Sequence, residues 1–334
     1  MTIREQIEQR EKECLSLYAT LSINTRGRET PEEPCDIRPV FQRDRDRILH
    51  CKAFRRLKQK TQVFLLPKGD HYRTRLTHTL EVSQNARTIA KALRLNEDLA
   101  EAISLGHDLG HTPFGHAGER ALNDVCPGGF RHNEQSVRVV QFLEKDGRGL
   151  NLTWEVRDGI LNHQTAGSPS TLEGQIVRLS DKIAYINHDI DDAIRGGIIS
   201  EEDIPKELRN TLGKNVRERL NRLIHDVITN SMDQPSIRMS DEISQAMAEL
   251  RKYMFANVYQ NPQAKGEEGK AVQMVEKLYL YYEDRIELLP EHNRKRIELG
   301  DSEEQAVCDY IAGMTDTYAV KKFEDIFVPK AWKF

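Results

Sequence analysis

The sequence predicts an all-α protein, with one helical core and additional helices toward the C-terminal end. Apolar residues recur at helix spacing in nearly every periodic segment of the 334 residues, and no segment alternates convincingly at strand spacing. Polar breaks are few, and they fall at residues 24–36, 126–131 and 260–268. The sequence contains no internal repeat and no low-complexity segment.

The first strong helix prediction covers residues 73–93. Its apolar residues share one side of the helix, and they are Leu76, Leu80, Ala86, Ile89, Ala90 and Leu93. Asn96 is then expected to be the N-cap of a helix that carries Leu99, Ala102, Ile103 and Gly106. Thr112-Pro113 opens another helix, with Pro113 at the first position, where a missing N–H costs nothing.

The longest helix is predicted over residues 171–195, and Gly196-Gly197 is expected to end it. Its inward-facing residues are expected to be Ile176, Val177, Ile183, Ala184, Ile190 and Ile194. Further helices are predicted over residues 215–231, 240–259, 267–288 and 301–327.

The composition is typical of a soluble globular protein, with 31% charged and 38% hydrophobic residues. No apolar run approaches the roughly 20 residues that span a bilayer. The charged N-terminal segment lacks the apolar core of a secretory signal. We therefore expect a cytoplasmic protein that does not associate with membranes.

Two further features concern redox state and nucleic acid. The five cysteines are scattered and form no C-x-x-C pair, which favours free thiols in a reducing compartment; they are Cys14, Cys35, Cys51, Cys126 and Cys308. The net charge of -4 gives no global case for nucleic-acid binding. A local run of Arg and Lys at residues 43–60 is typical of a solvated helix face, and it leaves nucleic-acid binding open.

Histidines cluster in one part of the chain, since six of the eleven fall between His71 and His132. His107 and Asp108 are adjacent near a helix end, so one turn offers an imidazole and a carboxylate. A second His from the preceding helix and an Asp from a later one would complete a mixed nitrogen and oxygen set. Such a set suits Mn, Mg, Fe, Co, Ni or Zn, with positions left open for water and substrate.

Helix spacing also groups polar residues around this cluster. His116 and Glu119 are three residues apart, so a carboxylate lies beside an imidazole whose tautomer it can orient. Asp181, Tyr185 and Asp189 follow one another at intervals of four residues and form one stripe along the 171–195 helix.

Six blocks carry a family resemblance. They are FQRDRDRILHCKAFRRLKQKTQVF (41–64), TRLTHTLEVSQNAR (74–87), GHDLGHTPFGHAGE (106–119), FRHNEQS (130–136), SDKIAYINHDIDDA (180–193) and DYIAGMTDTYA (309–319). Together they resemble the HD-domain phosphohydrolases, and within them the dGTP triphosphohydrolase-like proteins. Thr317 departs from the basic residue expected in many relatives, a difference that concerns a peripheral contact.

The resemblance implies a fold, a metal site and a reaction. It implies a single HD-type phosphohydrolase domain over 1–334, with the HD core at about 60–200 and a helical C-terminal extension at about 201–334. The implied ligands of a divalent metal ion are His78, His107, Asp108 and Asp181. The implied reaction is hydrolysis of a deoxynucleoside triphosphate (dNTP) to deoxynucleoside and inorganic triphosphate, with water attacking the α-phosphorus.

The resemblance also assigns roles to further residues. His116 is implied as the proton-transfer residue, Glu119 as its orienting carboxylate and His132 as another active-site histidine. The implied phosphate contacts are Arg75, Lys182 and His111. The implied sugar contacts are Gln62, Tyr185 beside C2′ and Asp189 at the 3′-OH. Glu134 is implied as a substrate-binding residue that hydrogen-bonds near His132.

Oligomer state and regulation follow from the resemblance only in outline. It implies a homo-oligomer, often a hexamer or a tetramer, and leaves a nucleotide effector open. Two alternative functions remain at this stage. One is an HD phosphohydrolase acting on a nucleoside monophosphate, a cyclic nucleotide or an alarmone, and the other is a non-catalytic nucleotide sensor.

Overall fold

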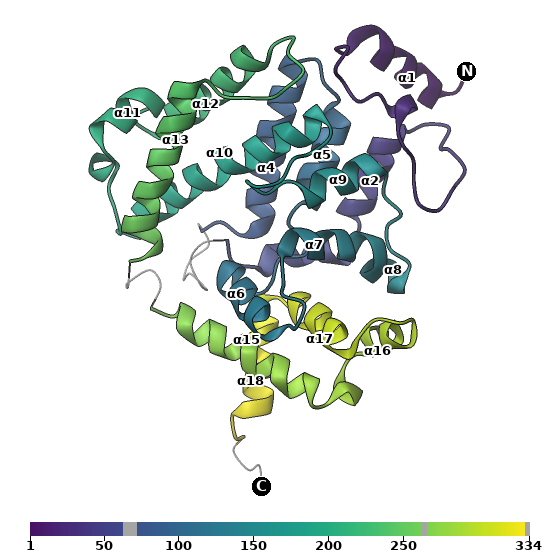
Figure 1. Cartoon of the computed structure of the whole chain (residues 1–334), viewed down its shortest axis with the longest axis vertical. Coiled ribbons are helices and arrows are strands. Elements are labelled where there is room, and N and C mark those ends of the chain that lie inside the picture. The colour runs from purple at the N-terminus through teal and green to yellow at the C-terminus, as the bar shows by residue number, and fades with distance from the viewer. Residues whose placement is uncertain (63–71, 262–265, 331–334) are drawn as a thin grey trace.

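A computed structural model describes residues 1–62, 72–261 and 266–330. His71 and part of the 260–268 break lie outside these residues. All named elements in the described part are helices, and the β-type pairing there is limited to the isolated bridges Arg28–Thr153 and Thr61–Thr74. The predicted all-α fold is therefore confirmed (Figure 1).

The α-helices follow one another along the whole chain. They are α1 (Ile3–Cys14), α2 (Val40–Leu49), α3 (Lys52–Arg56), α4 (Arg75–Ala92), α5 (Glu97–Gly106), α6 (Gly115–Val125), α7 (His132–Arg138), α8 (Glu144–Gly147), α9 (Trp154–Leu161), α10 (Leu172–Arg195), α11 (Lys206–Leu212), α12 (Val216–Ser231), α13 (Asp241–Met254), α15 (Glu268–Glu283), α16 (Glu291–Glu298), α17 (Glu303–Ala312) and α18 (Asp316–Phe327). Short 3₁₀ turns lie at Ser22–Asn24, Leu57–Gln59, Glu201–Asp203 and Ile286–Leu288, and π-helical turns lie at Val139–Leu143 and Phe255–Tyr259.

The larger of two apolar cores surrounds α4, α5 and α10. α4 packs against both α5 and α10, α2 covers α5, and α9 contacts α5, α7 and α10 (Figure 1). The buried side chains of this core continue into α11, α12 and α13 and include Ile89, Ile103, Ile183, Leu223 and Met254. Because these helices bury their apolar faces together, α4, α5 and α10 are held close to one another.

The smaller core joins α6 to the C-terminal helices. α15 packs against α6, α17 and α18, and α16 packs against α17. Ala117, Ala121 and Leu122 of α6 are buried in this second cluster, although α6 lies between helices of the first core in the sequence. Figure 1 shows α6 beside α15 at the junction of the two helix groups. α6 therefore links the larger core to the C-terminal helices.

Helix caps explain several boundaries that the sequence predicts correctly. The side chain of Asn96 accepts the N–H of Leu99 at 3.2 Å, so Asn96 is the N-cap of α5. The side chain of Thr171 caps α10 by accepting the N–H of Gly174 at 3.0 Å. α10 ends at Arg195, and Gly197 follows with a left-handed φ of 68°.

Three local predictions are wrong. Pro113 does not open α6, because Phe114 adopts a left-handed φ of 62° and the helix begins only at Gly115. The 301–327 helix is two helices, because the chain turns after Gly313 and the Thr315 side chain caps α18 by accepting the N–H of Tyr318 at 3.3 Å. Leu80 is predicted on the buried side of its helix but is 48% exposed, since it lies on the face of α4 that points away from the core.

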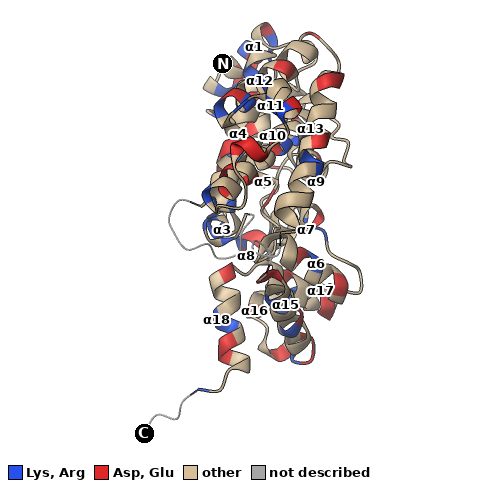
Figure 2. Cartoon of the chain, turned by 90° about the vertical axis from the view of Figure 1, so that its left-hand side faces the viewer, with Lys and Arg blue, Asp and Glu red and all other residues tan. Residues whose placement is uncertain are grey.

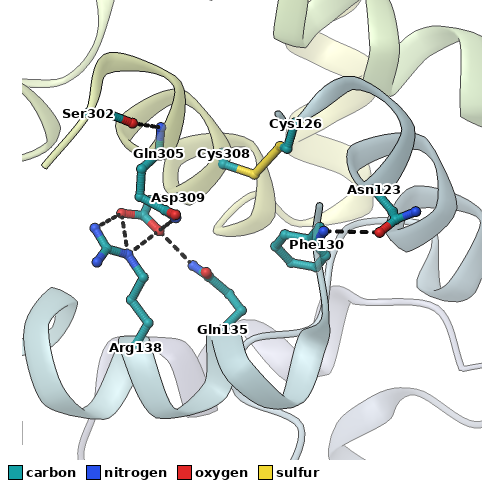
Figure 3. Close-up of a disulfide and its surroundings, with 9 residues drawn as sticks. All are labelled: Asn123, Cys126, Phe130, Gln135, Arg138, Ser302, Gln305, Cys308 and Asp309. Carbon is teal, nitrogen blue, oxygen red and sulfur yellow. Dashed lines mark hydrogen bonds and ion pairs between the residues drawn. A yellow bond between two sulfur atoms is a disulfide. The ribbon is translucent and has the colours of Figure 1, made fainter. Parts of the chain in front are cut away.

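The cysteine prediction is also wrong for one pair. Cys126 caps the end of α6 and Cys308 lies in α17, and the structure joins these two cysteines, 182 residues apart in sequence, in a disulfide (Figure 3). No local pattern marks such a pair, because it depends on how α6 packs against the C-terminal helices. Cys14, Cys35 and Cys51 are free, as predicted.

The basic run at residues 43–60 carries mostly paired charges. Arg43 and Arg47 contact Glu32 at 3.1 and 2.6 Å, and Arg45 contacts Asp98 at 3.2 Å. Blue and red segments are interspersed on the face seen in Figure 2. None of the described helices is both long enough and apolar enough to cross a membrane.

Candidate active site

The residues of the predicted metal set meet where α4, the end of α5 and α10 converge. His78 lies on α4, His107 caps α5 with Asp108 directly after it, and Asp181 lies on α10. Nε2 of His78 is 3.1 Å from Oδ1 of Asp181. Nε2 of His107 is 3.6 Å from Oδ1 of Asp108 and 3.8 Å from Oδ1 of Asp181.

These side chains fit a divalent cation. Two atoms that each bind one ion at roughly 2.1 Å lie at most roughly 4.2 Å apart, so the three measured separations are compatible with a shared ion. Nδ1 of His107 lies 2.6 Å from the carbonyl oxygen of Ser104, which accepts its proton and leaves Nε2 with a lone pair. That Nε2 is buried and has no hydrogen-bond partner in the described part of the chain.

A buried arginine adjoins this cluster. Nη1 of Arg75 donates to Oδ2 of Asp108 at 2.6 Å, and both side chains are almost fully buried. Burial alone would raise the pKa of Asp108, but electrostatic interactions with His107 and Arg75 outweigh it and hold that pKa well below its usual range. Nε and Nη2 of Arg75 are buried without a partner among the described residues, so two donors are free for an anion.

A second polar cluster is built on α6 and the start of α7. Glu119 Oε2 lies 3.2 Å from Nδ1 of His116, and Glu119 Oε1 lies 2.8 Å from Nδ1 of His132. His116 is largely exposed, whereas His132 is buried and stacks on the buried ring of His111, with ring centroids 4.4 Å apart. The carboxylate thus contacts one exposed and one buried imidazole.

Charge differs across this second cluster. Burial lowers the pKa of His111 well below its ordinary value, and the Arg75 charge adds to that effect, so His111 is neutral at pH 7. Burial also opposes the charged form of His132, but its hydrogen bond to Glu119 outweighs burial and raises its pKa. The two histidines that stack therefore have pKa values shifted in opposite directions.

The two clusters are contiguous. Ligand-type atoms of Asp108, His111 and His132 lie within 4.8 Å of one another. His163, which no sequence motif predicts, lies between the clusters: its Nε2 is 3.2 Å from Nε2 of His132, and its ring centroid is 4.9 Å from that of His107. Burial, together with electrostatic interactions with His107 and His132, lowers the pKa of His163 to about 4. None of the six sequence blocks contains this residue.

Close backbone packing explains two glycines in the GHDLGHTPFGHAGE block. A Cβ added at Gly110 would lie 2.2 Å from the backbone nitrogen of Ser136, and one added at Gly118 would lie 2.0 Å from the carbonyl oxygen of Pro113. The Ser136 hydroxyl accepts the N–H of Gly110 at 2.9 Å and contacts the carbonyl oxygen of His107 at 2.7 Å. These contacts dock α7, and with it His132, onto the His107-Asp108 turn.

Residues 309–319, the C-terminal sequence block, form hydrogen bonds with the segments that carry site residues. Asp309 of α17 binds Gln135 and Arg138 of α7 (Figure 3). Asp316 accepts the N–H of Thr61 and the N–H of Phe114, both at 2.9 Å. The C-terminal helices therefore fix the segments that precede α4 and α6, which a resemblance in sequence alone does not reveal.

Lys60 adds a contact between these parts. Its ammonium group donates to the carbonyl oxygen of Ala312 at 2.9 Å and to that of His111. Burial and the charge of Arg56 lower the pKa of Lys60 to about 7. In the sequence Lys60 is only one residue of a basic run, because its burial depends on contacts with α17.

The stripe on α10 lies next to the metal cluster. Tyr185 is half-buried, and burial raises its pKa to about 12. Asp189 is buried and accepts a hydrogen bond from the hydroxyl of Tyr259. Lys182 is half-buried, and burial together with the charges of Arg178 and Arg251 lowers its pKa.

The remaining predicted residues differ in placement. The buried side-chain oxygen of Gln62 has no partner among the described residues, and the Gln62 backbone lies near Gly115, which is also close to Arg75. Glu134 is exposed and pairs with Arg131 at 3.4 Å, so the structure shows it on the surface rather than in the clusters. Thr317 is exposed in the first turn of α18.

Comparisons with known proteins match both parts of the chain. The HD domain family matches residues 75–186, and the phosphohydrolase-associated domain family matches residues 237–325. A deoxyguanosinetriphosphate triphosphohydrolase-like protein of Caldanaerobacter subterraneus is 60% identical over 99% of this chain and 98% of its own length. A protein of the same name from Clostridium perfringens is 52% identical over 99% of both chains.

A solved structure supports the fold. A phosphohydrolase from Bacteroides thetaiotaomicron superposes with a TM-score of 0.52 at 15% identity, covering 84% of this chain and 68% of the other.

Proposed function

The chain belongs to the family of deoxyguanosinetriphosphate triphosphohydrolase-like proteins, which are HD-domain phosphohydrolases, and we propose that it hydrolyses dNTPs to deoxynucleoside and inorganic triphosphate. One observation carries this proposal. The buried His-Asp cluster around His107 continues through Asp108 into the His132–Glu119 pair, so the proposed cation site would adjoin the proposed proton-transfer site.

We propose His78, His107, Asp108 and Asp181 as the ligands of a divalent cation, which is Mn, Mg, Fe, Co, Ni or Zn. Such a cation supplies positive charge beside the α-phosphate when it is bound. The partnerless Nε2 of His107 and the proximity of Asp181 to both histidines support this set. The cation is expected to be required for hydrolysis.

Phosphate binding is assigned to three side chains beside the metal cluster, those of Arg75, Lys182 and His111. Arg75 has two buried donors without a partner in the described structure, and a triphosphate can accept both. Lys182 follows Asp181 directly, and the positive charges of Arg178 and Arg251 act on it, so three cationic side chains are available near Asp181 for a polyanion. We assign His111 to the same phosphate, since its buried Nδ1 has no partner among the described residues.

Proton transfer is assigned to His116, with Glu119 and His132 in support. The leaving 5′ oxygen needs a proton, and His116 is the exposed imidazole of the pair that Glu119 contacts. Glu119 holds His116 and His132 from one carboxylate, which orients both rings.

Sugar recognition is assigned to Tyr185, Asp189 and Gln62. Tyr185 lies one turn after Asp181, so its ring is proposed to pack against C2′ of a nucleotide whose α-phosphate is at the metal cluster. Asp189 is proposed to accept the 3′-OH, and the partnerless buried oxygen of Gln62 is a further acceptor for the sugar.

A product screen tests the proposal. The full-length protein is incubated with each of the four dNTPs and, in parallel, with nucleoside monophosphates, cyclic nucleotides and an alarmone. Mg, Mn or Co is supplied in turn, and the products are separated by anion-exchange and reversed-phase chromatography. Equal amounts of deoxynucleoside and inorganic triphosphate are expected. Pyrophosphate with a deoxynucleoside monophosphate would contradict it, and so would hydrolysis confined to a cyclic nucleotide or an alarmone. Metal binding with no hydrolysis of any nucleotide would favour a sensor.

A further inference from the structure

Two residues outside the predicted site, His188 and Glu81, continue a row of polar contacts that begins at the His78 ring. Nδ1 of His78 lies 3.3 Å from Nδ1 of His188 on α10, and the two rings are perpendicular. Nε2 of His188 contacts the carboxylate of Glu81, one turn after His78 on α4. Both histidines are buried, at 2% and 4% exposure, so water does not compete for these nitrogens.

If His78 is a metal ligand, hydrogen-bond chemistry allows only one arrangement of protons along the row of side chains His78, His188 and Glu81. Nε2 of His78 faces Asp181 and is the coordinating atom of the proposed set, so it must carry a lone pair. The proton of a neutral His78 then lies on Nδ1 and needs an acceptor. Nδ1 of His188 accepts it, which puts the His188 proton on Nε2, where the Glu81 carboxylate accepts it.

We propose that His188 and Glu81 are positioning residues that fix the tautomer and orientation of His78 and thereby strengthen divalent-cation binding. This inference rests on the proposed metal set. A histidine ligand whose second nitrogen donates to a carboxylate, directly or through a relay, is a stronger ligand, and loss of such a partner typically weakens metal binding by about 10- to 100-fold.

Glu81, the last residue of this His78–His188–Glu81 relay, is itself held in place by an ion pair. Glu81 is 40% exposed, yet Nε of Arg73 holds its carboxylate at 3.2 Å. Arg73 is fixed in turn by Asp191 at 2.7 Å and Asp192 at 3.1 Å on α10. The relay therefore begins and ends on the α4–α10 contact that also brings His78 to Asp181.

His107 provides an internal contrast. Its Nδ1 donates to the backbone carbonyl of Ser104, which no side-chain substitution removes. The orientation of His78 depends on side chains, so its contribution to metal binding can be changed without touching a ligand.

The test measures Mn²⁺ and Co²⁺ affinity by isothermal titration of metal-free full-length protein. The variants are His188→Phe, which keeps a ring but removes the acceptor, Glu81→Ala, and Glu81→Gln, whose amide oxygen still accepts from His188. Glu97→Gln, a carboxylate at the surface start of α5, is the matched control. His188→Phe and Glu81→Ala are expected to weaken both metals at least about 10-fold, and Glu81→Gln is expected to recover most of that loss.

Thermal unfolding of the metal-free variants separates positioning from mere helix packing. A purely structural tie between α4 and α10 would lower stability in Glu81→Gln and Glu81→Ala without separating their metal affinities. ¹⁵N-histidine NMR of the Zn²⁺-loaded wild type adds a direct readout, and His188 is expected to be protonated at Nε2 alone. Wild-type affinity in His188→Phe and Glu81→Ala would overturn the inference and leave the proposed function intact. Failure of wild type to bind any divalent cation would instead overturn the metal site itself.

Discussion

Oε1 of Glu119 lies 2.9 Å from the backbone nitrogen of His132 and 2.8 Å from Nδ1 of the same residue, so one carboxylate oxygen accepts both hydrogen bonds. This contact ties α6 to the first residue of α7. It also pairs an ionised carboxylate with an imidazole whose pKa it raises, because burial favours the neutral His132 and Glu119 reverses that preference. The pKa of Glu119 lies far below its usual value of 4.5, since the hydrogen bonds from His116 and His132 outweigh its burial.

The first prediction concerns the pH dependence of this pair. Glu119 has a lowered folded pKa, so its contribution to stability is present above the unfolded value of 4.5 and is lost as pH falls toward the folded pKa. His132 has a raised folded pKa, so its contribution is complete below 6.5 and is lost as pH rises through the folded pKa. The free-energy difference between wild type and Glu119→Gln is therefore expected to be largest between pH 4.5 and 6.5, at about 1.5–3 kcal/mol.

Urea unfolding of metal-free protein from pH 4 to 9 measures this difference. Glu134→Gln, which removes an exposed carboxylate paired with Arg131, is the control and should follow wild type throughout. A difference that is flat with pH, or that grows above pH 8, would contradict the charged pair.

The second prediction concerns His116. His116→Ala is expected to retain bound metal and to bind dNTP, yet to turn over at least about 100-fold more slowly, because an acid–base group is lost. Single-turnover kinetics with metal analysis checks this. Near-normal turnover in a folded variant would move the role to His132 or to water.

The third prediction concerns the packing of α7. Gly110→Ala places a methyl group against the backbone of Ser136, so it is expected to cost about 1–3 kcal/mol or more and to displace His132. Gly128→Ala is the matched control, since nothing lies within 4 Å of its added Cβ. Denaturant unfolding of both variants checks the difference. Equal free energies of unfolding for Gly110→Ala and Gly128→Ala would contradict this prediction, because they would show that α7 shifts to accommodate the methyl group without loss of stability.

The fourth prediction concerns sugar selectivity. Wild type is expected to prefer dGTP to GTP and dATP to ATP, and Tyr185→Ala is expected to reduce both ratios. Steric exclusion is needed for any preference above about 100-fold, because an apolar pocket alone rejects a hydroxyl by no more than that. Asp189→Ala should weaken all dNTPs alike. Unchanged ratios in Tyr185→Ala, measured as kcat/KM, would remove this residue from sugar recognition.

The sequence predicts helices well where the signal is local. The Asn96 cap and the extent and periodicity of α10 depend on residues within one or two turns. The start of α6 is missed because Phe114 is held in a left-handed conformation while Asp316, about 200 residues away, binds its N–H. The residues that favour α6 are close in sequence, but the hydrogen bond between Phe114 and Asp316 joins distant residues, so a local pattern does not place the first residue of α6.

The same division applies to the site. Spacing and resemblance identify His78, His107, Asp108 and Asp181, and these side chains do converge in the structure. They do not identify His163 between the two clusters, the His188–Glu81 relay or the Cys126–Cys308 pair, because each depends on how separate helices pack. Glu134 matches a motif, yet it points to the surface, so a motif match does not fix the direction of a side chain.

We propose that the His78, His107, Asp108 and Asp181 set holds a cation that hydrolysis requires. The most direct measurement determines metal content and inorganic triphosphate release from dGTP on the same samples of wild type, His107→Ala, Asp181→Ala and the exposed-histidine control His225→Ala. Wild type and His225→Ala are expected to bind metal stoichiometrically and to release triphosphate, while His107→Ala and Asp181→Ala lose both. Stoichiometric metal in His107→Ala and Asp181→Ala would contradict the claim.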